Sequence, residues 1–135
     1  MTRRIALAAL SLFLAFAGAA GCSLFHGKKA SAAAKPPARI LKLDSTVLNL
    51  ADASPAYLRI GVSLGITSVD QNQDARVESV ARDTIVSLAS AQTAAELLTP
   101  AGKNNLKQAI LASLRKRLPQ TGVERVYFDE FLVQH

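Results

Sequence analysis

The chain has 135 residues, half of which are hydrophobic, and it carries a formal net charge of +6. This length accommodates one modest domain with a short extension. Most of the surplus charge lies before residue 39, because the remainder holds 11 basic and 10 acidic residues. A nucleic-acid-binding protein concentrates positive charge on its folded domain, so this balance excludes that class.

Residues 1–22 have the layout of an export signal. Arg3 and Arg4 precede an apolar run, residues 5–21, which ends in small residues. As a helix this run would be about 25 Å long, slightly less than the bilayer core of about 30 Å. The chain's single cysteine, Cys22, follows directly, and this ending resembles the bacterial lipobox. We therefore predict cleavage before Cys22 and lipid attachment to its thiol, with an uncleaved membrane anchor as the alternative.

Residues 23–38 are rich in Ser, Ala, Lys and Pro, and they predict a flexible linker. The adjacent Pro36 and Pro37 favour an extended chain just before residue 39. The sequence thus divides into a signal or anchor (1–22), a linker (23–38) and a folded domain (39–135). In both interpretations of the N-terminus the domain lies outside the cytoplasm and is tethered to a membrane.

Two β segments open the predicted domain. Residues 39–50 are predicted to form one strand, and the composition of residues 51–55 predicts a turn. In residues 56–66 aliphatic side chains alternate with small or polar ones, which predicts a second strand and an antiparallel hairpin. Gly61 and Gly65 leave the other face of this strand bare, so we expect another segment to approach it closely.

Helical patterns occupy the middle of the chain. Apolar residues at spacings of three and four predict an amphipathic helix over residues 77–88. Thr93 and Glu96 fit a capping box that opens a short helix. Thr99 followed by Pro100 predicts the start of a longer helix. Basic residues line the side of this helix opposite its apolar stripe, and they form either a contact surface or a solvated face.

Residues 122–134 are predicted to form the last strand, which completes the order β-β-α-α-β. The predicted fold class is therefore α+β, with a small antiparallel sheet packed on helices. Strict alternation along this strand places Asp129 and Glu130 on opposite faces of the sheet. We accordingly expect two surface acids rather than a pair that shares a proton or a substrate.

The predicted domain lacks the residue combinations of common catalytic and cofactor sites. His135, at the chain end, is its single histidine, and it contains no cysteine. Metal-ligand spacing is absent, and the segment around Gly102 and Lys103 lacks the other residues of a phosphate-binding loop. We therefore expect no enzyme activity, no metal and no cofactor, and a small hydrolase is the weakest alternative.

Three segments carry a family pattern in the same order. The early segment has Asn49-Leu50 followed by Tyr57-Leu58. The pattern Leu-Leu-x-Pro-x-Gly-Lys is met by Leu97, Leu98, Pro100, Gly102 and Lys103. The pattern Val-x-Phe-x-x-Phe-x-x-Gln is met by Val126, Phe128, Phe131 and Gln134. Over about residues 40–134 the chain thus resembles the periplasmic domain of FliL, a family of flagellar basal body-associated proteins.

This resemblance implies a bacterial inner-membrane protein whose periplasmic domain is similar to the stomatin-like (SPFH) fold. It also implies self-association into rings and association with the motor stator proteins MotA and MotB, without enzyme activity. The chain differs from the family in its short tail and lipobox-like ending, so lipidation would also permit the outer membrane. The alternative function is a periplasmic lipoprotein adaptor that binds another envelope protein and has no role in motility.

Overall fold

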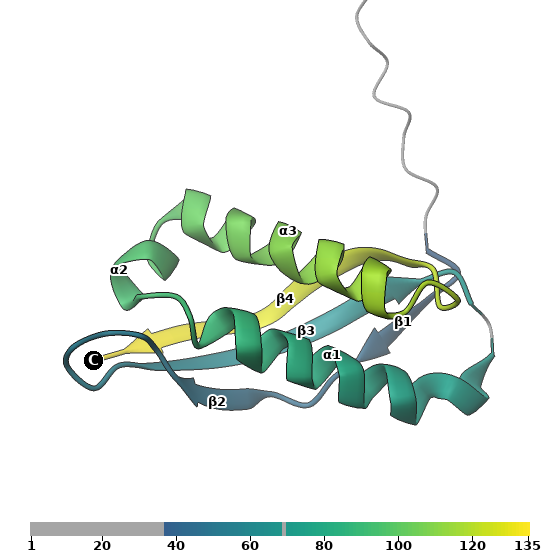
Figure 1. Ribbon diagram of the computed structural model, residues 1–135, viewed down its shortest axis with the longest axis horizontal. Coiled ribbons are helices and arrows are strands. Elements are labelled where there is room, and N and C mark those ends of the chain that lie inside the picture. Colours follow the sequence, from purple (N-terminus) through teal and green to yellow (C-terminus); the bar gives the residue numbers. More distant parts are fainter. Residues whose placement is uncertain (1–36, 69) are drawn as a thin grey trace, which may run out of the picture. The chain divides into compact units, whose positions relative to one another are not determined.

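The computed structural model describes residues 37–68 and 70–135. Four strands form one antiparallel sheet, and two long helices lie on it (Figure 1), which confirms the predicted α+β class. The elements in chain order are β1 (Arg39–Lys42), β2 (Thr46–Asn49), β3 (Tyr57–Ile66), the 3₁₀ turn η1 (Gln71–Gln73), α1 (Asp74–Ala89), α2 (Ala94–Leu97), α3 (Pro100–Arg117) and β4 (Val123–Gln134).

β3 is the central strand of the sheet. β4 pairs with one edge of β3 along its whole length, from Gln134 opposite Tyr57 to Val123 opposite Ile66. β1 and β2 share the other edge, where β1 pairs with the C-terminal part of β3 and β2 with the N-terminal part. All pairings are antiparallel, and β2 and β3 form the predicted hairpin.

The prediction of one continuous strand over residues 39–50 is wrong, because the chain breaks between β1 and β2. Leu43 and Leu48 are both buried in the core. They are five positions apart in the sequence, and a regular strand turns residues at an odd spacing to opposite faces. The break at residues 43–45 absorbs this mismatch, and both leucines join one cluster.

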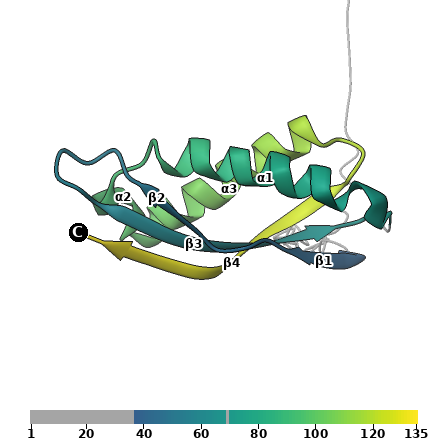
Figure 2. The same ribbon diagram turned by 90° about the horizontal axis from the view of Figure 1, so that it is seen from below.

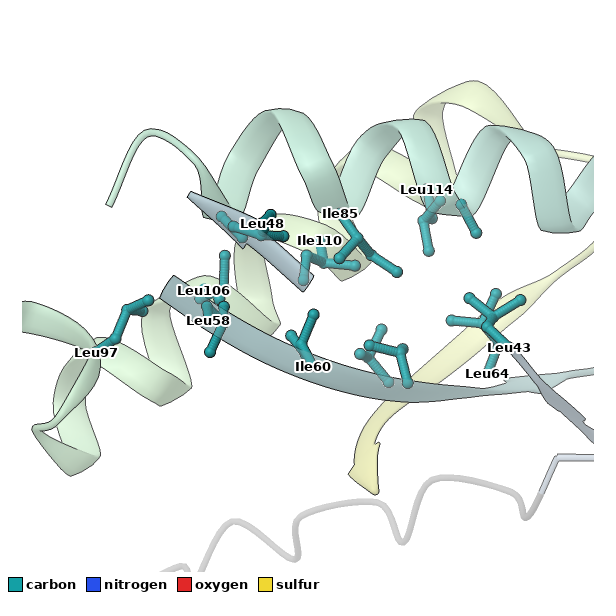
Figure 3. Packing of buried hydrophobic residues seen from close by; sticks show 14 of the residues in the cluster. Leu43, Leu48, Leu58, Ile60, Leu64, Ile85, Leu97, Leu106, Ile110 and Leu114 are labelled. Carbon is teal, nitrogen blue, oxygen red and sulfur yellow. The ribbon is translucent and has the colours of Figure 1, made fainter. Parts of the chain in front are cut away.

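The helices α1 and α3 pack on one face of the sheet, which we call the covered face (Figure 2). Every second side chain of β3 points from this face into the core (Figure 3). Full burial of one aliphatic side chain contributes about 1.5–3 kcal/mol, so this layer is the main source of stability. Its central members are Leu58, Ile60, Leu64, Ile85, Leu106, Ile110 and Leu114.

The predicted helices form with the expected faces inward. α1 buries Val77, Ala81 and Ile85, and α3 buries the predicted leucine and isoleucine stripe. After α3 the chain turns into β4 at Gly122, whose φ of 62° lies in the left-handed region. A Cβ at that position would also lie 1.9 Å from the Thr67 hydroxyl, so only glycine fits this turn.

The predicted signal, Cys22 and nearly all of the predicted linker lie outside the described residues. Within residues 37–68 and 70–135, no helix has both the length and the apolar character required to cross a bilayer. The likeness to the stomatin-like fold remains a prediction from the family resemblance.

Candidate functional site

The family-pattern residues at the start of α3 form a tight corner between α2 and α3. Leu97 is fully buried, whereas its neighbour Leu98 is 56% exposed. Pro100 occupies the first turn of α3, and the Thr99 hydroxyl accepts a hydrogen bond from the Gly102 backbone N–H at 2.9 Å. An N-cap threonine followed by proline fixes where the helix begins, so this short segment sets the direction of α3.

Gly102 is required here by a close contact. A Cβ on this residue would lie 2.0 Å from the carbonyl oxygen of Glu96 and 2.7 Å from its carbonyl carbon. These are backbone atoms at the end of α2, and they cannot rotate out of the way. Any larger residue at position 102 would therefore push α3 away from α2.

Two lysines of α3 lie over two phenylalanines of β4, and we call these four residues the α3–β4 seam. Lys103 Nζ is 5.4 Å from the ring centroid of Phe131, and Lys107 Nζ is 5.0 Å from that of Phe128. The two ring centroids are 5.2 Å apart. Ammonium groups at this distance are attracted to the ring faces. The seam thus joins the two main pattern segments, which are far apart in the sequence.

The remaining pattern positions of β4 lie outside the seam. Val126 is buried in the core opposite Leu64, and Gln134 is exposed opposite Tyr57 at the end of the sheet. Most of the pattern residues therefore occupy structural positions on the covered face. The pattern residues that the domain leaves exposed are Asn49, Tyr57, Leu98, Pro100 and Gln134.

A β-bulge in β4 overturns the predicted alternation of its faces. Glu130 pairs with Gly61 and Phe128 pairs with Val62, which leaves Asp129 without an opposite residue. A regular strand would have placed the two phenylalanines of the seam on opposite faces. The extra residue returns both of them to the covered face, where α3 covers them.

Asp129 and Glu130 consequently both lie on the face of the sheet away from the helices, which we call the open face. Asp129 accepts a hydrogen bond from the Ser63 hydroxyl. Glu130 accepts one from the Ser45 hydroxyl at 2.8 Å and lies 2.9 Å from Nε of Arg59. The prediction that the two acids point to opposite faces is therefore wrong, because alternation does not anticipate a bulge. Each carboxylate has its own partner.

The close approach predicted at the strand glycines is present and comes from the chain itself. Pro37 lies against Gly65, where a Cβ would be 2.9 Å from Pro37 Cγ. Ser45 and Glu130 lie against Gly61 in the same way. These side chains cover the middle of the open face.

The basic residues at the end of α3 are also used within the fold. Arg115 donates hydrogen bonds to two backbone carbonyl groups at the start of β4. Arg117 donates to the Thr84 hydroxyl and lies 2.7 Å from an Asp83 carboxylate oxygen. The other two lysines, Lys103 and Lys107, belong to the seam. Among the described residues, Lys116 is thus the cation of α3 without a hydrogen bond, ion pair or ring contact. The basic side of α3 is mostly committed to internal contacts.

Arg39 ties the start of the domain to α1, a contact that sequence reasoning missed. Its guanidinium donates to both carboxylate oxygens of Asp74 and to the backbone carbonyls of Ser68 and Asp70. The hydrogen bond from Arg39 lowers the pKa of the Asp74 carboxyl, and the same bond raises the pKa of Arg39. The pair is 35 residues apart, so no local spacing indicated it.

The predicted capping box at the start of α2 is confirmed. The Thr93 hydroxyl accepts from the Glu96 backbone N–H, and the Glu96 carboxylate accepts from the Thr93 backbone N–H at 3.0 Å. The hydrogen bond from the Thr93 backbone lowers the pKa of Glu96. This carboxylate is therefore held ionised for a structural purpose.

The described residues offer surfaces for binding more clearly than a centre for chemistry. Within residues 37–68 and 70–135, no three His, Cys, Asp or Glu side chains are grouped to hold a metal ion. The carboxyls with a lowered pKa belong to a salt bridge and a helix cap. The exposed apolar side chains, by contrast, are concentrated on the open face.

Comparison with known proteins agrees with the motif positions. The family model described as flagellar basal body-associated protein FliL matches residues 40–134. The flagellar protein FliL of Aquifex aeolicus (strain VF5) is 36% identical over an alignment of 110 residues, and the match covers 78% of this chain and 68% of that protein. A match over the whole sheet and both long helices favours a flagellar role over an adaptor unrelated to motility. The chain therefore belongs to the FliL family of flagellar basal body-associated proteins.

Proposed function

We propose that this chain is a membrane-tethered, non-enzymatic scaffold that forms a ring around the flagellar motor stator and supports or activates it. The observation that carries this proposal is the family match over residues 40–134, which includes every strand and helix of the sheet domain except the first residue of β1. Family membership itself assigns the chain a flagellar role in the bacterial envelope. The ring and the contact with the stator proteins MotA and MotB are proposals that go beyond family membership.

The surface of the domain is suited to holding other proteins. Leu98 at the α2–α3 corner and several side chains of the open face are apolar and exposed. Asp129 and Glu130 of β4 and the two arginines of α3 are paired within the fold. A scaffold needs exposed contact surfaces on a rigid core, and this distribution fits that need.

The proposed tether consists of residues 1–22 as signal or anchor and residues 23–38 as linker, with the domain over 39–135. The ends of a flexible 16-residue linker average about 20–25 Å apart, so the domain would stay close to the membrane. Tethering to one surface raises the effective concentration of neighbouring copies. Weak contacts between domains would then be sufficient for a ring.

Motor torque tests the proposed function. We expect deletion of the gene to lower torque at high load or the number of engaged stator units, and the full chain to restore it. The measurement is the rotation of beads attached to single flagella, with steps counted as stator units engage. Unchanged torque, unit number and swarming in the deletion strain would show that the chain does not support the stator.

The proposed lipid attachment at Cys22 is tested by the intact mass of the full chain purified from its membrane. A mass for residues 22–135 plus diacylglyceryl and acyl groups supports the lipoprotein. A mass for the uncut chain shows that residues 5–21 remain as the anchor. The Cys22→Ser variant is the matched control, because it removes the acceptor thiol and leaves the apolar run intact.

A further inference from the structure

The charges of the domain are divided unevenly between its two ends. The described residues of 37–39, 67–76 and 115–125 lie at the end of the sheet where β1 begins and β3 ends (Figure 1), and we call this the basic end. These ranges of the sequence hold six basic and three acidic residues, whereas the rest of 37–135 holds five basic and seven acidic residues. The near-neutral total therefore conceals an excess of positive charge at one end and of negative charge elsewhere.

The segments of the basic end form one continuous surface. The Ser68 backbone N–H donates a hydrogen bond to the Thr121 carbonyl at 3.2 Å, which joins the chain after β3 to the turn after α3. Arg76 at the start of α1 and Arg117 at the end of α3 line one hollow together with this turn. Basic residues from the two long helices are therefore neighbours at this end of the domain.

The three acids of the basic end are engaged within the fold or turned inward. Asp74 accepts two hydrogen bonds from the Arg39 guanidinium. The Asp70 carboxylate accepts one from the Asn72 backbone N–H at 3.0 Å. One carboxylate oxygen of Glu124 is buried. These acids therefore offset little of the positive charge that faces the solvent.

The cations of the basic end are more accessible than its acids. Arg76 and Lys116 are exposed, and neither makes a hydrogen bond or an ion pair with another described residue. Arg117 leaves 41% of its side chain exposed beside Asp83, and Arg115 is exposed as well. The surface that this end presents is therefore positive.

A positive surface of this kind matches the headgroups of anionic lipids. Such headgroups attract clustered lysines and arginines that lie near the membrane, and they require no shaped pocket. Nucleic acid is the poorer match, because the domain as a whole carries almost no excess positive charge. The described chain also begins at this end, since Pro37 packs on Gly65 next to the end of β3. A membrane tether that joins the domain at Pro37 therefore brings the basic end nearest to the lipid.

We propose that the basic end docks on anionic lipid headgroups of the membrane that holds the tether. Arg76 and Lys116 supply unpaired charge for the lipid phosphates, and Arg115 and Arg117 add to the positive field around them. β3 is ten residues long, or about 33 Å, so docking holds α2 and Leu98 at the far end away from the lipid. The docking rests on the membrane tether of the proposed function and deepens it, because it fixes an orientation that a flexible linker leaves free.

The expected strength of the docking makes it dependent on the tether. One lysine or arginine near an anionic surface strengthens binding about fivefold, so the two unpaired cations together contribute about 25-fold. The tether adds to this by keeping the domain at a high effective concentration beside the lipid. Because the attraction acts between exposed charges, added salt weakens it.

The test is the relaxation of backbone amide protons by gadolinium attached to lipid headgroups, measured by NMR on the full chain in nanodiscs. In nanodiscs that contain phosphatidylglycerol, we expect strong relaxation at residues 71–76 and 118–122 and little at residues 50–56 and 94–98. In nanodiscs of phosphatidylcholine alone, the difference between the two ends should fall at least about threefold, because the lipid then carries no net charge.

Two double variants with the same net charge isolate the basic end. Arg76→Gln with Lys116→Gln removes its two unpaired cations and should reduce the difference as much as phosphatidylcholine does. Arg59→Gln with Arg82→Gln removes two cations elsewhere on the domain and should leave the difference unchanged. All four positions are exposed, so the thermal unfolding temperature should change little in either variant.

The docking is wrong if the two ends relax equally, if phosphatidylcholine gives the same pattern, or if the control variant lowers the difference as much. Basic-end variants that lower motor torque without changing the relaxation would assign this end to an acidic protein, which also overturns the docking. Bead rotation separates the two proposals. Docking with normal torque in the deletion strain removes only the stator role, whereas reduced torque in that strain without docking removes only the docking.

Discussion

Gly102 and Arg39 are single residues whose contacts hold elements of the domain together. Gly102 lets the first turn of α3 lie against the carbonyl group of Glu96. Arg39 connects β1 to Asp74 at the start of α1 through a bidentate ion pair. Each contact can be tested by one conservative substitution.

Gly102→Ala should destabilise the domain although alanine is the better helix former. The new methyl group would meet the Glu96 carbonyl at 2.0 Å, and overpacking of this kind costs about 1–3 kcal/mol. The free energy of unfolding in urea measures the effect. Asn104→Ala, at an exposed position of the same helix, is the control and should be neutral or slightly stabilising. A stabilised Gly102→Ala variant would show that α2 and α3 have room to separate.

The Arg39–Asp74 pair should make stability depend on acid pH. Its hydrogen bond lowers the pKa of Asp74 in the folded state, below the value of about 3.9 for a free aspartate. The contribution is therefore fully present above that value and is lost as pH falls through the folded-state pKa. We expect Asp74→Asn to lower stability at pH 7 and to lose less stability on acidification than the parent. Glu78→Gln on the same helix is the control, and an identical acid profile for it and Asp74→Asn would contradict the account.

Two interruptions of regular strand structure keep the apolar side chains of the strands on the covered face. The break between β1 and β2 lets Leu43 and Leu48 face the same core. The bulge at Asp129 lets Phe128 and Phe131 lie together under α3. In both places an odd spacing of apolar residues is reconciled with a single covered face.

Two variants test separately the side chain of Asp129 and the extra backbone residue that it adds to β4. Asp129→Ala removes one hydrogen bond to Ser63 and should cost about 1 kcal/mol. Deletion of the residue should shift the strand before it by one position and turn Val126 and Phe128 to the open face, with a loss of about 4 kcal/mol or more. Circular dichroism and urea unfolding distinguish the two. A deletion variant as stable as the alanine variant would mean that the bulge is dispensable.

The α3–β4 seam should show a measurable coupling between Lys103 and Phe131. Lys103→Met keeps most of the apolar stem and removes the charge, and Phe131→Leu removes the ring. A double-mutant cycle on unfolding free energy should give a coupling of about 0.5–1 kcal/mol, the range for exposed cation–π pairs. The same cycle with Lys116→Met should give none, since Lys116 has no ring contact in the described part of the chain. Equal couplings for the two lysines would reject the specific contact.

The sequence predicted those elements whose signals are local. The alternation in β3, the helical spacing of α1, the capping box of α2 and the Thr-Pro start of α3 are each visible within a few residues. The β1–β2 break, the bulge and the Arg39–Asp74 pair were missed because they depend on what lies across the sheet. At the candidate site, the pattern residues were found by resemblance. Their physical roles, such as the clearance at Gly102, required the folded structure.

At the scale of the described domain, Pro37 packs near one end of the sheet, and three exposed apolar side chains of the open face lie toward the other end, namely Val47, Tyr57 and Leu132. The contact of Pro37 with Gly65 fixes the entry point. Tyr57 lies eight residues from Gly65 along β3, or about 26 Å, so these side chains are remote from that contact. The basic residues of α3 are mostly used internally, which leaves the open face as the larger candidate contact surface.

The most direct test of the central claim is electron cryotomography of flagellar motors in intact cells, averaged with and without this chain. The account predicts a periplasmic ring of density around each stator unit in the parent, its loss in the deletion strain, and its return with the full chain. Identical averages from the two strains, or a lost density that lies away from the stator, would contradict the account.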